Sequence, residues 1–357
     1  MSRLAVVLMN LGGPDRLDAV QPFLFNLFND PAIIGVPQPV RWMLAQFISR
    51  RRAPVASEIY EELGGGSPLL PNTQAQADAL AADLDRRALA EEVKCFIAMR
   101  YWHPLTEQTV EAVSAWRPDR ILLLPLYPQY STTTSASSVK EWHRWAGKKD
   151  LTAPTTTVCC YPALPGLVST VAESVREGLH ELAGDRTPRV LFSAHGLPEK
   201  VVAAGDPYKF QVEQTAAAVV AALEGEDFDW TVCYQSRVGP LEWIKPYTED
   251  EIKRAARDGV PLVVVPIAFV SEHSETLVEL DIEYRDLANE YAVPGYYRAA
   301  TVGDSDAFVR SLGELVTDAV ASGSKLCSEQ GIRLCPADRG KCAFATLPAG
   351  AENGGSG

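Results

Sequence analysis

Short apolar runs that alternate with longer helical patterns constrain the fold of this 357-residue chain most strongly. The runs are almost continuously hydrophobic, which is typical of strands covered on both faces in a parallel sheet. They lie at residues 4–9, 93–99, 121–126, 190–192 and 262–267. Helical patterns lie between and after them, at residues 73–90, 167–182, 208–223 and 305–321. This alternation predicts βαβ units and a doubly wound α/β fold.

The length and a coarse internal similarity predict two domains. At roughly 150 residues per domain, the chain has room for about two. Each half has a strand, a turn with Gly and Pro, and then a helix, with the turns at residues 10–14 and 193–198. We place the boundary in the Pro-rich region, which gives domains 1–166 and 167–322. The small, polar residues 348–357 are expected to be disordered.

Charge and hydropathy exclude two classes of protein. The chain has 33 Lys and Arg against 46 Asp and Glu, a net charge of −13. Such an acidic chain is unsuited to nucleic-acid phosphates, so no nucleic-acid partner is expected. No apolar run reaches the 18 residues of a transmembrane helix, and the N-terminus resembles a first strand, not a signal peptide. We therefore expect a cytoplasmic protein.

The chain has seven cysteines, and an odd number without a signal peptide favours a reducing compartment. Cys95 and Cys233 lie inside apolar strands and are predicted to be core residues. Three others fall within 16 residues near the C-terminus, a crowding that calls for an explanation: Cys327, Cys335 and Cys342.

A segment at residues 40–52 differs in character from the rest. Its apolar residues precede three consecutive arginines at positions 50–52, and they are Trp42, Met43, Leu44, Phe47 and Ile48. An apolar patch beside a cationic cluster is typical of a helix that lies in a membrane interface. A core-packed helix with a solvated basic end is the alternative, and both interpretations stay open at this point.

Two strand ends carry candidate catalytic chemistry. His195 follows the run at 190–192, where open α/β sheets place their binding crevices, although a structural histidine is the alternative. After the run at 262–267, Glu275, Glu279 and Glu283 recur every four residues behind His273. Such a stripe can be a solvated face, but carboxylates with imidazole also suit divalent cations and proton removal. On an α-helix the stripe would drift by about 40° per step, whereas a π-type widening would align it.

Two glycine-rich turns, at residues 10–14 and 64–68, can present backbone N–H groups to an anion. Neither matches a phosphate-binding fingerprint, so a nucleotide-binding enzyme is only weakly supported. Tight turns that need positive φ angles are the simpler interpretation.

These features occur together in one family: the sequence resembles the ferrochelatases, which insert Fe²⁺ into protoporphyrin IX at the end of haem synthesis. The matching stretches keep the family's order over about residues 1–325: LMNLGGP (8–14), RRAP (51–54), GGGSP (64–68), MRYWHPLTE (99–107), LPLYPQYSTTTSASS (124–138), LFSAHGLP (191–198), CYQSRVGPLEWIKP (233–246) and PIAFVSEHSETLVELDIEY (266–284). The resemblance implies the chelatase-like fold, with two similar Rossmann-like domains. Each would hold a parallel four-stranded sheet flanked by helices, and a short extension would follow at residues 323–347.

The resemblance also implies residue roles. His195 matches the favoured acceptor of pyrrole protons, Glu275 its acidic partner, and His273 a supporting residue. Residues implied on the metal path are Glu279, Glu283, Arg100 and Tyr101. Residues implied in porphyrin binding are Met9, Tyr60, Ser67, Tyr130 and Trp243. Members that use protoporphyrin carry an apolar lip at the place of residues 40–52, which implies peripheral membrane contact.

Some members hold a [2Fe–2S] cluster with three C-terminal thiolates and a fourth from the body of the protein. Cys327, Cys335 and Cys342 supply three, and a short cluster-binding extension is implied. Residues 129–133 have no cysteine where animal members place the fourth, so Cys159 or Cys160 is the best candidate. A zinc site with four cysteines is the main alternative, and unliganded thiols are another.

The sequence supports three other functions less well. A coproporphyrin ferrochelatase would have a less apolar lip, so residues 42–48 and the cysteine tail favour protoporphyrin. A non-catalytic haem- or metal-binding protein on the same scaffold would not need both His195 and Glu275. A nucleotide-binding enzyme lacks its fingerprint. The sequence does not decide between a monomer and a homodimer.

Overall fold

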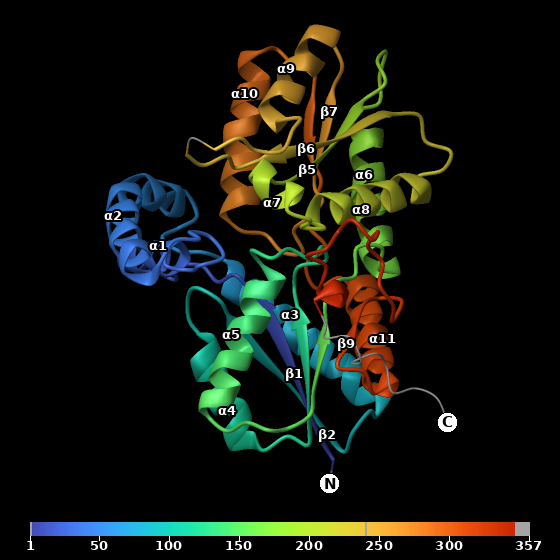
Figure 1. Ribbon diagram of the computed structural model, residues 1–357. Coiled ribbons are helices and arrows are strands. Elements are labelled where there is room, and N and C mark those ends of the chain that lie inside the picture. The colour runs from blue at the N-terminus through green and yellow to red at the C-terminus, as the bar shows by residue number, and fades with distance from the viewer. Residues whose placement is uncertain (1, 240, 347–357) are drawn as a thin grey trace. The chain divides into compact units, whose positions relative to one another are not determined.

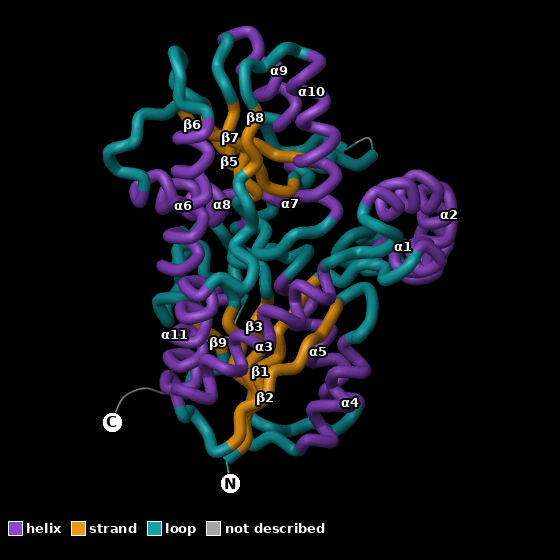
Figure 2. The backbone as a smooth tube through the Cα atoms, turned by 180° about the vertical axis from the view of Figure 1, so that it is seen from behind, coloured by secondary structure: helices purple, strands orange, loops and turns teal. Residues whose placement is uncertain are grey.

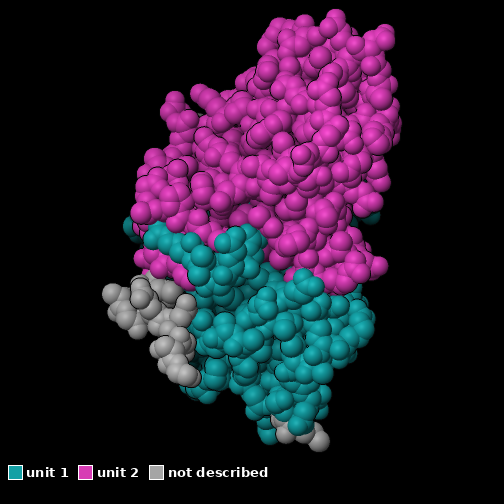
Figure 3. Space-filling view, turned by 90° about the vertical axis from the view of Figure 1, so that its right-hand side faces the viewer, with its two compact units in different colours: residues 1–160, 312–333, 347–357 teal, residues 161–311, 334–346 magenta. Residues whose placement is uncertain are grey.

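The chain consists of two compact units, shown in Figure 3. The computed structural model describes residues 2–239 and 241–346. Of the described residues, unit 1 comprises 2–160 and 312–333, and unit 2 comprises 161–239, 241–311 and 334–346.

The units differ from the predicted domain ranges in two places. The first division follows residue 160 instead of 166, and residues 312–322 belong to unit 1 instead of the second domain. These residues form the end of helix α11(Asp306–Ser322), where the carbonyl of Val320 accepts a hydrogen bond from Arg120 of unit 1 at 2.6 Å. The predicted extension 323–347 is divided between both units, and the predicted tail at 348–357 lies outside the described residues.

Unit 1 is built on a parallel sheet of five strands in the order β2-β1-β3-β4-β9. The strands are β1(Arg3–Asn10), β2(Glu92–Met99), β3(Arg120–Pro125), β4(Thr155–Val158) and β9(Leu326–Cys327). The expectation of four strands is wrong for this unit because the C-terminal extension adds β9, whose Leu326 pairs with Thr157 of β4. A strand of two residues is too short to leave a hydrophobic pattern in the sequence.

Helices cover the sheet of unit 1, as Figures 1 and 2 show. Its helices are η1(Leu17–Ala19), α1(Val20–Phe28), α2(Gln38–Glu62), α3(Leu69–Arg87), α4(Thr106–Trp116) and α5(Ser135–Lys148). The side chains of Val7 and Met9 on β1 pack against Val113 of α4 and Trp142 of α5. Helices α1 and α2 pack on each other beside the sheet (Figures 1 and 2).

Unit 2 is built on a parallel sheet of four strands in the order β6-β5-β7-β8. The strands are β5(Arg189–His195), β6(Asp229–Gln235), β7(Leu262–Pro266) and β8(Tyr296–Arg298). Its helices are α6(Pro165–Glu181), α7(Glu199–Ala203), α8(Tyr208–Ala222), α9(Thr248–Asp258), the π-helix η2(Glu275–Glu283), α10(Tyr284–Glu290) and the short η3(Ala343–Ala345). Leu191, Val264 and Leu280 join β5, β7 and the π-helix in one apolar core. The expected α/β class with helix-flanked parallel sheets is confirmed.

Within the described residues, no helix combines the length and the hydropathy that crossing a membrane requires.

Candidate active site

The centre of the candidate site is a pair of side chains at the carboxyl ends of two neighbouring strands. His195 is the last residue of β5, and Glu275 begins the π-helix that follows β7. His195 Nδ1 lies 3.0 Å from Glu275 Oε2, and both side chains are partly exposed. Doubly wound sheets bind ligands outside this edge, where the strand order reverses around β5.

The pair sets the charge of both members. Burial alone would lower the pKa of His195, but the charge and hydrogen bond of Glu275 outweigh it and raise that pKa above the ordinary imidazole value. Burial would raise the pKa of Glu275, but the neighbouring His195 lowers it to about 2. Glu275 is therefore a carboxylate at neutral pH, and His195 is a stronger base than a free imidazole.

His273 differs from His195 because it is buried without an ion-pair partner among the described residues. Burial lowers its pKa, so its imidazole is neutral at neutral pH. Its ring lies 4.7 Å from that of Phe269, and its Nδ1 has no hydrogen-bond partner in the described part of the chain. Thr276 holds the backbone here, since its Oγ1 donates to the His273 carbonyl at 3.0 Å.

Glu279 lies one step further along the π-helix and accepts hydrogen bonds from three neighbours. Gln235 Nε2 donates at 2.9 Å, the Ser236 amide at 2.9 Å and the Tyr284 hydroxyl at 3.1 Å. Burial, together with the nearby charge of Glu275, raises the pKa of Glu279. Glu279 is therefore a stronger base than Glu275.

The sequence analysis missed these three partners of Glu279, although Gln235 and Ser236 lie in the quoted stretch CYQSR. The available signal was position, because Gln235 ends β6 at the same sheet edge as His195. Gln235 Nε2 also lies 3.1 Å from the Glu275 carbonyl, so it fixes the start of the π-helix as well.

A cavity of about 380 Å³ adjoins this row of carboxyl groups. Its lining includes Ser236, Trp243, Tyr247, Glu249, Glu279 and Glu283. Glu283 is exposed at its end of the row. The acidic lining can attract a dication, and oxygen ligands release Fe²⁺ more readily than sulfur or nitrogen ligands do.

Trp243 lies close to the proposed base. Its ring centroid is 6.3 Å from that of His195, with the two planes at 80°. Gly196 permits this approach, because a Cβ there would lie 3.1 Å from the Trp243 ring and 3.0 Å from the Gln235 carbonyl oxygen.

The segment 275–283 is a π-helix, as the four-residue spacing of its carboxylates favours. The Tyr284 amide at its end donates to the Glu279 carbonyl, a five-residue step instead of the four of an α-helix. Leu280, on another side of the π-helix, is fully buried in the core of unit 2. The structure thus brings His195, His273, Glu275 and Glu279 together in unit 2.

In unit 1, the implied metal-path residues surround a buried carboxylate that the sequence analysis missed. Asp30 Oδ2 accepts hydrogen bonds from Arg100 Nη2 at 2.7 Å, Tyr101 OH at 2.8 Å and Ser137 Oγ at 2.5 Å. Asp30 lies in an irregular segment after α1, where no motif or period indicates a role.

The residues of unit 1 implied in porphyrin binding occupy separate environments. Met9 lies in the core of the sheet and is only 1% exposed. Tyr60, a residue of α2, is buried against residues of α1. Ser67 lies in the second glycine-rich turn, and its Oγ leaves no room for a Cβ at Gly13 in the first. Tyr130 is buried in the segment before α5.

Helix α2 exposes most of the residues expected in an apolar lip. The exposed fractions are 47% for Trp42, 58% for Met43, 38% for Leu44 and 64% for Phe47. Ile48 instead packs toward the core formed by α1 and α2. The exposed apolar side chains are not what a core-packed helix would show.

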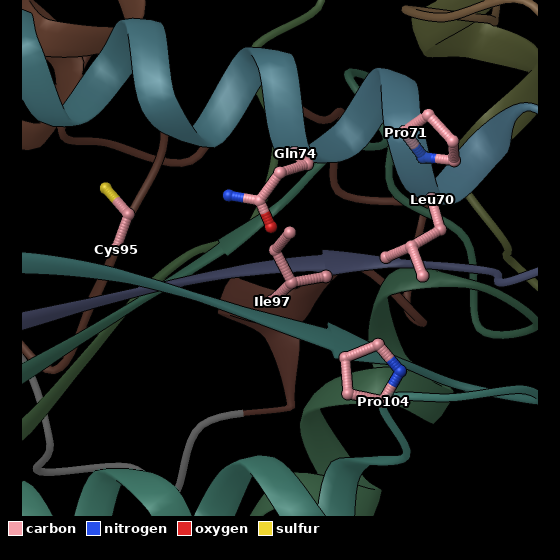
Figure 4. Close-up of a pocket in the computed structure, with 6 residues that line it drawn as sticks. All are labelled: Leu70, Pro71, Gln74, Cys95, Ile97 and Pro104. Carbon is pink, nitrogen blue, oxygen red and sulfur yellow. The ribbon is translucent and has the colours of Figure 1, made fainter.

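A second cavity, of about 480 Å³, lies between α3 and β2 and is shown in Figure 4. It is lined by Leu70, Pro71, Gln74, Cys95, Ile97 and Pro104, none of which is a predicted site residue. The prediction that Cys95 is a core residue is wrong, because β2 is an edge strand and leaves this side chain half-buried. Burial raises the pKa of the Cys95 thiol to about 12, so it is no nucleophile at neutral pH. Cys233, in β6, is fully buried as expected.

The other cysteines are all buried. Cys159 and Cys160 follow β4 with their Sγ atoms 3.4 Å apart, and Cys327 lies in the adjacent β9. Burial and the neighbouring Cys160 raise the pKa of Cys327 to about 12. Cys335, in unit 2, accepts a hydrogen bond from Gln211 Nε2 at 3.1 Å, and the Cys342 amide donates to the Arg339 carbonyl. Among the described residues, no group of three or more His, Cys, Asp or Glu side chains is arranged to hold a metal ion.

Comparisons with known proteins show the family of the chain. The sequence profile of the ferrochelatase family matches residues 3–320. The chain is 54% identical over 345 residues to a ferrochelatase of Phenylobacterium zucineum, covering 96% of this chain and 98% of that one. It is 52% identical over 340 residues to a ferrochelatase of Caulobacter vibrioides, covering 95% and 97%.

Among solved structures, SirB from Bacillus subtilis with Fe³⁺ has the same fold, with a TM-score of 0.51 at 13% identity, covering 90% of this chain and 97% of that one. The solved structure shows only the fold, whereas the sequence profile and the relatives show the family. The chain belongs to the ferrochelatase family, the metal chelatases that insert iron into porphyrin in haem biosynthesis.

Proposed function

We propose that this chain inserts Fe²⁺ into protoporphyrin IX to form protohaem, and that His195 accepts the pyrrole protons. The observation that carries this assignment is the 3.0 Å contact between His195 Nδ1 and Glu275 Oε2 at the carboxyl edge of the sheet. A histidine that donates its Nδ1–H to a carboxylate keeps a lone pair on Nε2. That atom can then take a proton from a bound macrocycle.

The proton balance of metallation suits this pair. The porphyrin loses two N–H protons as it gains a dication, so its net charge does not change. When Nε2 takes one proton, the imidazolium lies beside the Glu275 carboxylate, which is ionised at neutral pH. Glu279 can accept a proton further along the row because its pKa is raised. His273, which burial keeps neutral, supports the pair without adding a competing charge.

The same row provides for the metal. Glu279 and Glu283 line the 380 Å³ cavity, and their carboxylates attract a dication without the tight hold of sulfur or imidazole ligands. Arg100 and Tyr101 remain proposed metal-path residues in unit 1, and Asp30 keeps both in place there. Of the proposed porphyrin contacts, Trp243 lies beside the base, whereas Met9, Tyr60, Ser67 and Tyr130 rest on the resemblance.

The test is anaerobic metal insertion followed by the change in the Soret band. We expect product from protoporphyrin IX and Fe²⁺, and much less from coproporphyrin. H195A should lose about 10²- to 10⁴-fold in rate, the usual contribution of a proton-transfer group, while still binding porphyrin. If neither porphyrin is metallated, the proposed function is wrong; if H195A turns over normally, His195 is not the base.

We also propose that the protein is cytoplasmic and peripherally bound to the membrane through α2. The exposed Trp42, Met43, Leu44 and Phe47 support this, together with the arginines at positions 50–52 that follow them. An apolar, poorly soluble substrate gives membrane docking a physical purpose. Such a helix lies in the interface without spanning the bilayer.

A [2Fe–2S] cluster held by Cys327, Cys335, Cys342 and either Cys159 or Cys160 is the last part of the proposal. The candidate thiols are buried, and sulfur donors are the ligand type that such clusters take. Insertion of Fe²⁺ needs no electron transfer, so a bound cluster would be structural or would sense iron or redox state. Zinc on the same thiols is the competing assignment.

A further inference from the structure

The π-helix that carries the acidic row is held from behind by one arginine of the neighbouring strand. Arg298, the last residue of β8, donates from Nε to Asp281 Oδ1 at 3.0 Å and from Nη2 to Asp281 Oδ2 at 2.6 Å. Its third nitrogen, Nη1, donates to Glu272 Oε1 at 2.6 Å. One guanidinium thus binds a carboxylate before the π-helix and another inside it.

The other contacts of this surface also come from the β8 region. The Tyr296 hydroxyl donates to the Leu280 carbonyl at 2.7 Å, inside the π-helix. The Thr301 amide donates to Glu272 Oε1 at 3.0 Å. The π-helix is therefore tied directly to β8 at two places, by Arg298 and by Tyr296, and the segment before it is tied through Glu272. Glu275 and Glu279 instead contact β5 and β6 residues, His195 and Gln235.

This anchoring has a physical reason. A π-helix is rare and occurs mostly as a single turn, and carboxylates four residues apart repel one another. A bidentate arginine pair has a fixed planar geometry, so it specifies the direction of the bound carboxylate as well as its distance. The Arg298 side chain is only 11% exposed and each carboxylate only 25%, so solvent screens these contacts weakly.

We propose that Arg298 is a positioning residue for metal insertion: by binding Glu272 and Asp281 together, it locks the π-helix in the register that presents Glu275 to His195. The inference rests on the proposed function, since it assigns Arg298 to the same site. Arg298 touches neither His195 nor Glu275 in the contacts described above, so it acts only through the backbone it holds.

The test uses R298K, which keeps the charge but cannot form both arms, and D281N, which weakens the bidentate arm at constant shape. The matched control is R257Q, because Arg257 is an exposed residue in the last turn of α9 and lies outside the contacts described above. Arg285 is unsuitable, since it donates to the Asp281 carbonyl and to the Tyr296 carbonyl, each at 3.1 Å. Two readouts are needed: steady-state insertion of Zn²⁺ into protoporphyrin IX, and amide hydrogen exchange of the peptide that spans residues 275–283.

We expect both R298K and D281N to exchange these amides about tenfold faster or more, without a change in exchange over β5. Their kcat should fall about tenfold or more, with the KM for porphyrin within about twofold, because misplacement of a catalytic group by about 1 Å has such costs. R257Q should match the parent protein in both readouts. In the pH–rate profile of R298K, the acid limb should also lie at a lower pH than in the parent protein, because a displaced Glu275 raises the pKa of His195 less.

Unchanged exchange of residues 275–283 in both variants would overturn the proposal, whatever the activity. Faster exchange with unchanged kcat would show that the contacts of Arg298 with Glu272 and Asp281 have only a structural role, and would also overturn the proposal. If the parent protein inserts no metal while R298K still exchanges faster, the proposed function is wrong, but Arg298 still anchors the π-helix.

Discussion

At the scale of single residues, His195 and Glu275 show how one contact fixes two protonation states. Each pKa moves away from its ordinary value mainly because the other side chain is there, against the effect of burial. The pKa of Glu279, four residues further along the same helix, is shifted in the opposite direction to that of Glu275, because Glu279 is buried beside an existing negative charge. Two carboxyl groups of one type, four residues apart, therefore have pKa values shifted in opposite directions.

The pH dependence of insertion tests this pair. His195 can accept a proton only when it is neutral, so the rate falls as the pH drops through its pKa. Glu275 raises that pKa, and the E275Q variant should therefore move the acid limb of kcat/KM to lower pH. The maximal rate should fall about tenfold or more, because a weaker and less oriented base removes protons more slowly.

The measurement is a pH–rate profile of Zn²⁺ insertion by the parent and by E275Q. E290Q is the control, because Glu290 is an exposed carboxylate on α10 outside the site. If the acid limb lies at the same pH in all three proteins, His195 is not the group whose titration limits the rate.

At the scale of helices and strands, the sequence predicted those elements whose hydrophobic pattern is set by their own residues. The runs at 4–9 and 190–192 lie within β1 and β5, and the pattern at 208–223 corresponds to α8(Tyr208–Ala222). The strands β8(Tyr296–Arg298) and β9(Leu326–Cys327) were not predicted, because they are too short to leave a hydrophobic pattern in the sequence. Their pairing partners lie far away in sequence, which a local pattern cannot register.

The site was predicted where position and residue type coincide, at a strand end. His195 and the row from Glu275 were both found this way. Asp30 and Gln235 were missed because their roles depend on which distant side chains the fold brings to them, Arg100 in one case and Glu279 in the other. Arg298 was missed for the same reason, since its two carboxylates lie in a segment that is separate in the sequence.

Helix α2 gives a prediction at this scale. Replacing Met43 and Phe47 together by glutamate should weaken binding to vesicles that contain anionic lipid by about 10²-fold or more, since each buried apolar side chain contributes about 1.5–3 kcal/mol. Both side chains are more than half exposed, so the fold should tolerate the change. Vesicle co-sedimentation measures the binding, and insertion in detergent should stay within about twofold of the parent rate.

The control for this prediction is I332E. Ile332 is 58% exposed but lies far along the chain from α2. Equal losses in I332E and in the double variant would show that added negative charge, and not the lip, reduces vesicle binding.

At the scale of the whole molecule, the C-terminal extension contributes to both units. Leu326 and Cys327 complete the sheet of unit 1, whereas Cys335 and Cys342 belong to unit 2. In unit 2 the extension is held by backbone contacts, such as that of the Lys341 amide with the Gly205 carbonyl at 3.1 Å. A Cβ at Gly205 would lie 3.0 Å from the Gly340 nitrogen, so this close approach depends on glycine.

A bound group on these thiols should therefore change the stability of the molecule and not just its colour. Metal binding contributes to folding free energy when the site is absent from the unfolded chain. For a [2Fe–2S] protein we expect a red-brown sample with equal iron and acid-labile sulfide, and a thermal midpoint that falls by several degrees when the cluster is removed.

The cysteine ligands can be identified by single substitutions. C335S should lose the visible absorption, and of C159S and C160S one should lose it and the other keep it, which identifies the fourth ligand. C95S is the matched control, since Cys95 lies in the cavity by β2, and it should keep the full spectrum. A colourless protein that contains zinc would replace the cluster assignment, and a spectrum that survives in both C159S and C160S would exclude both as ligands.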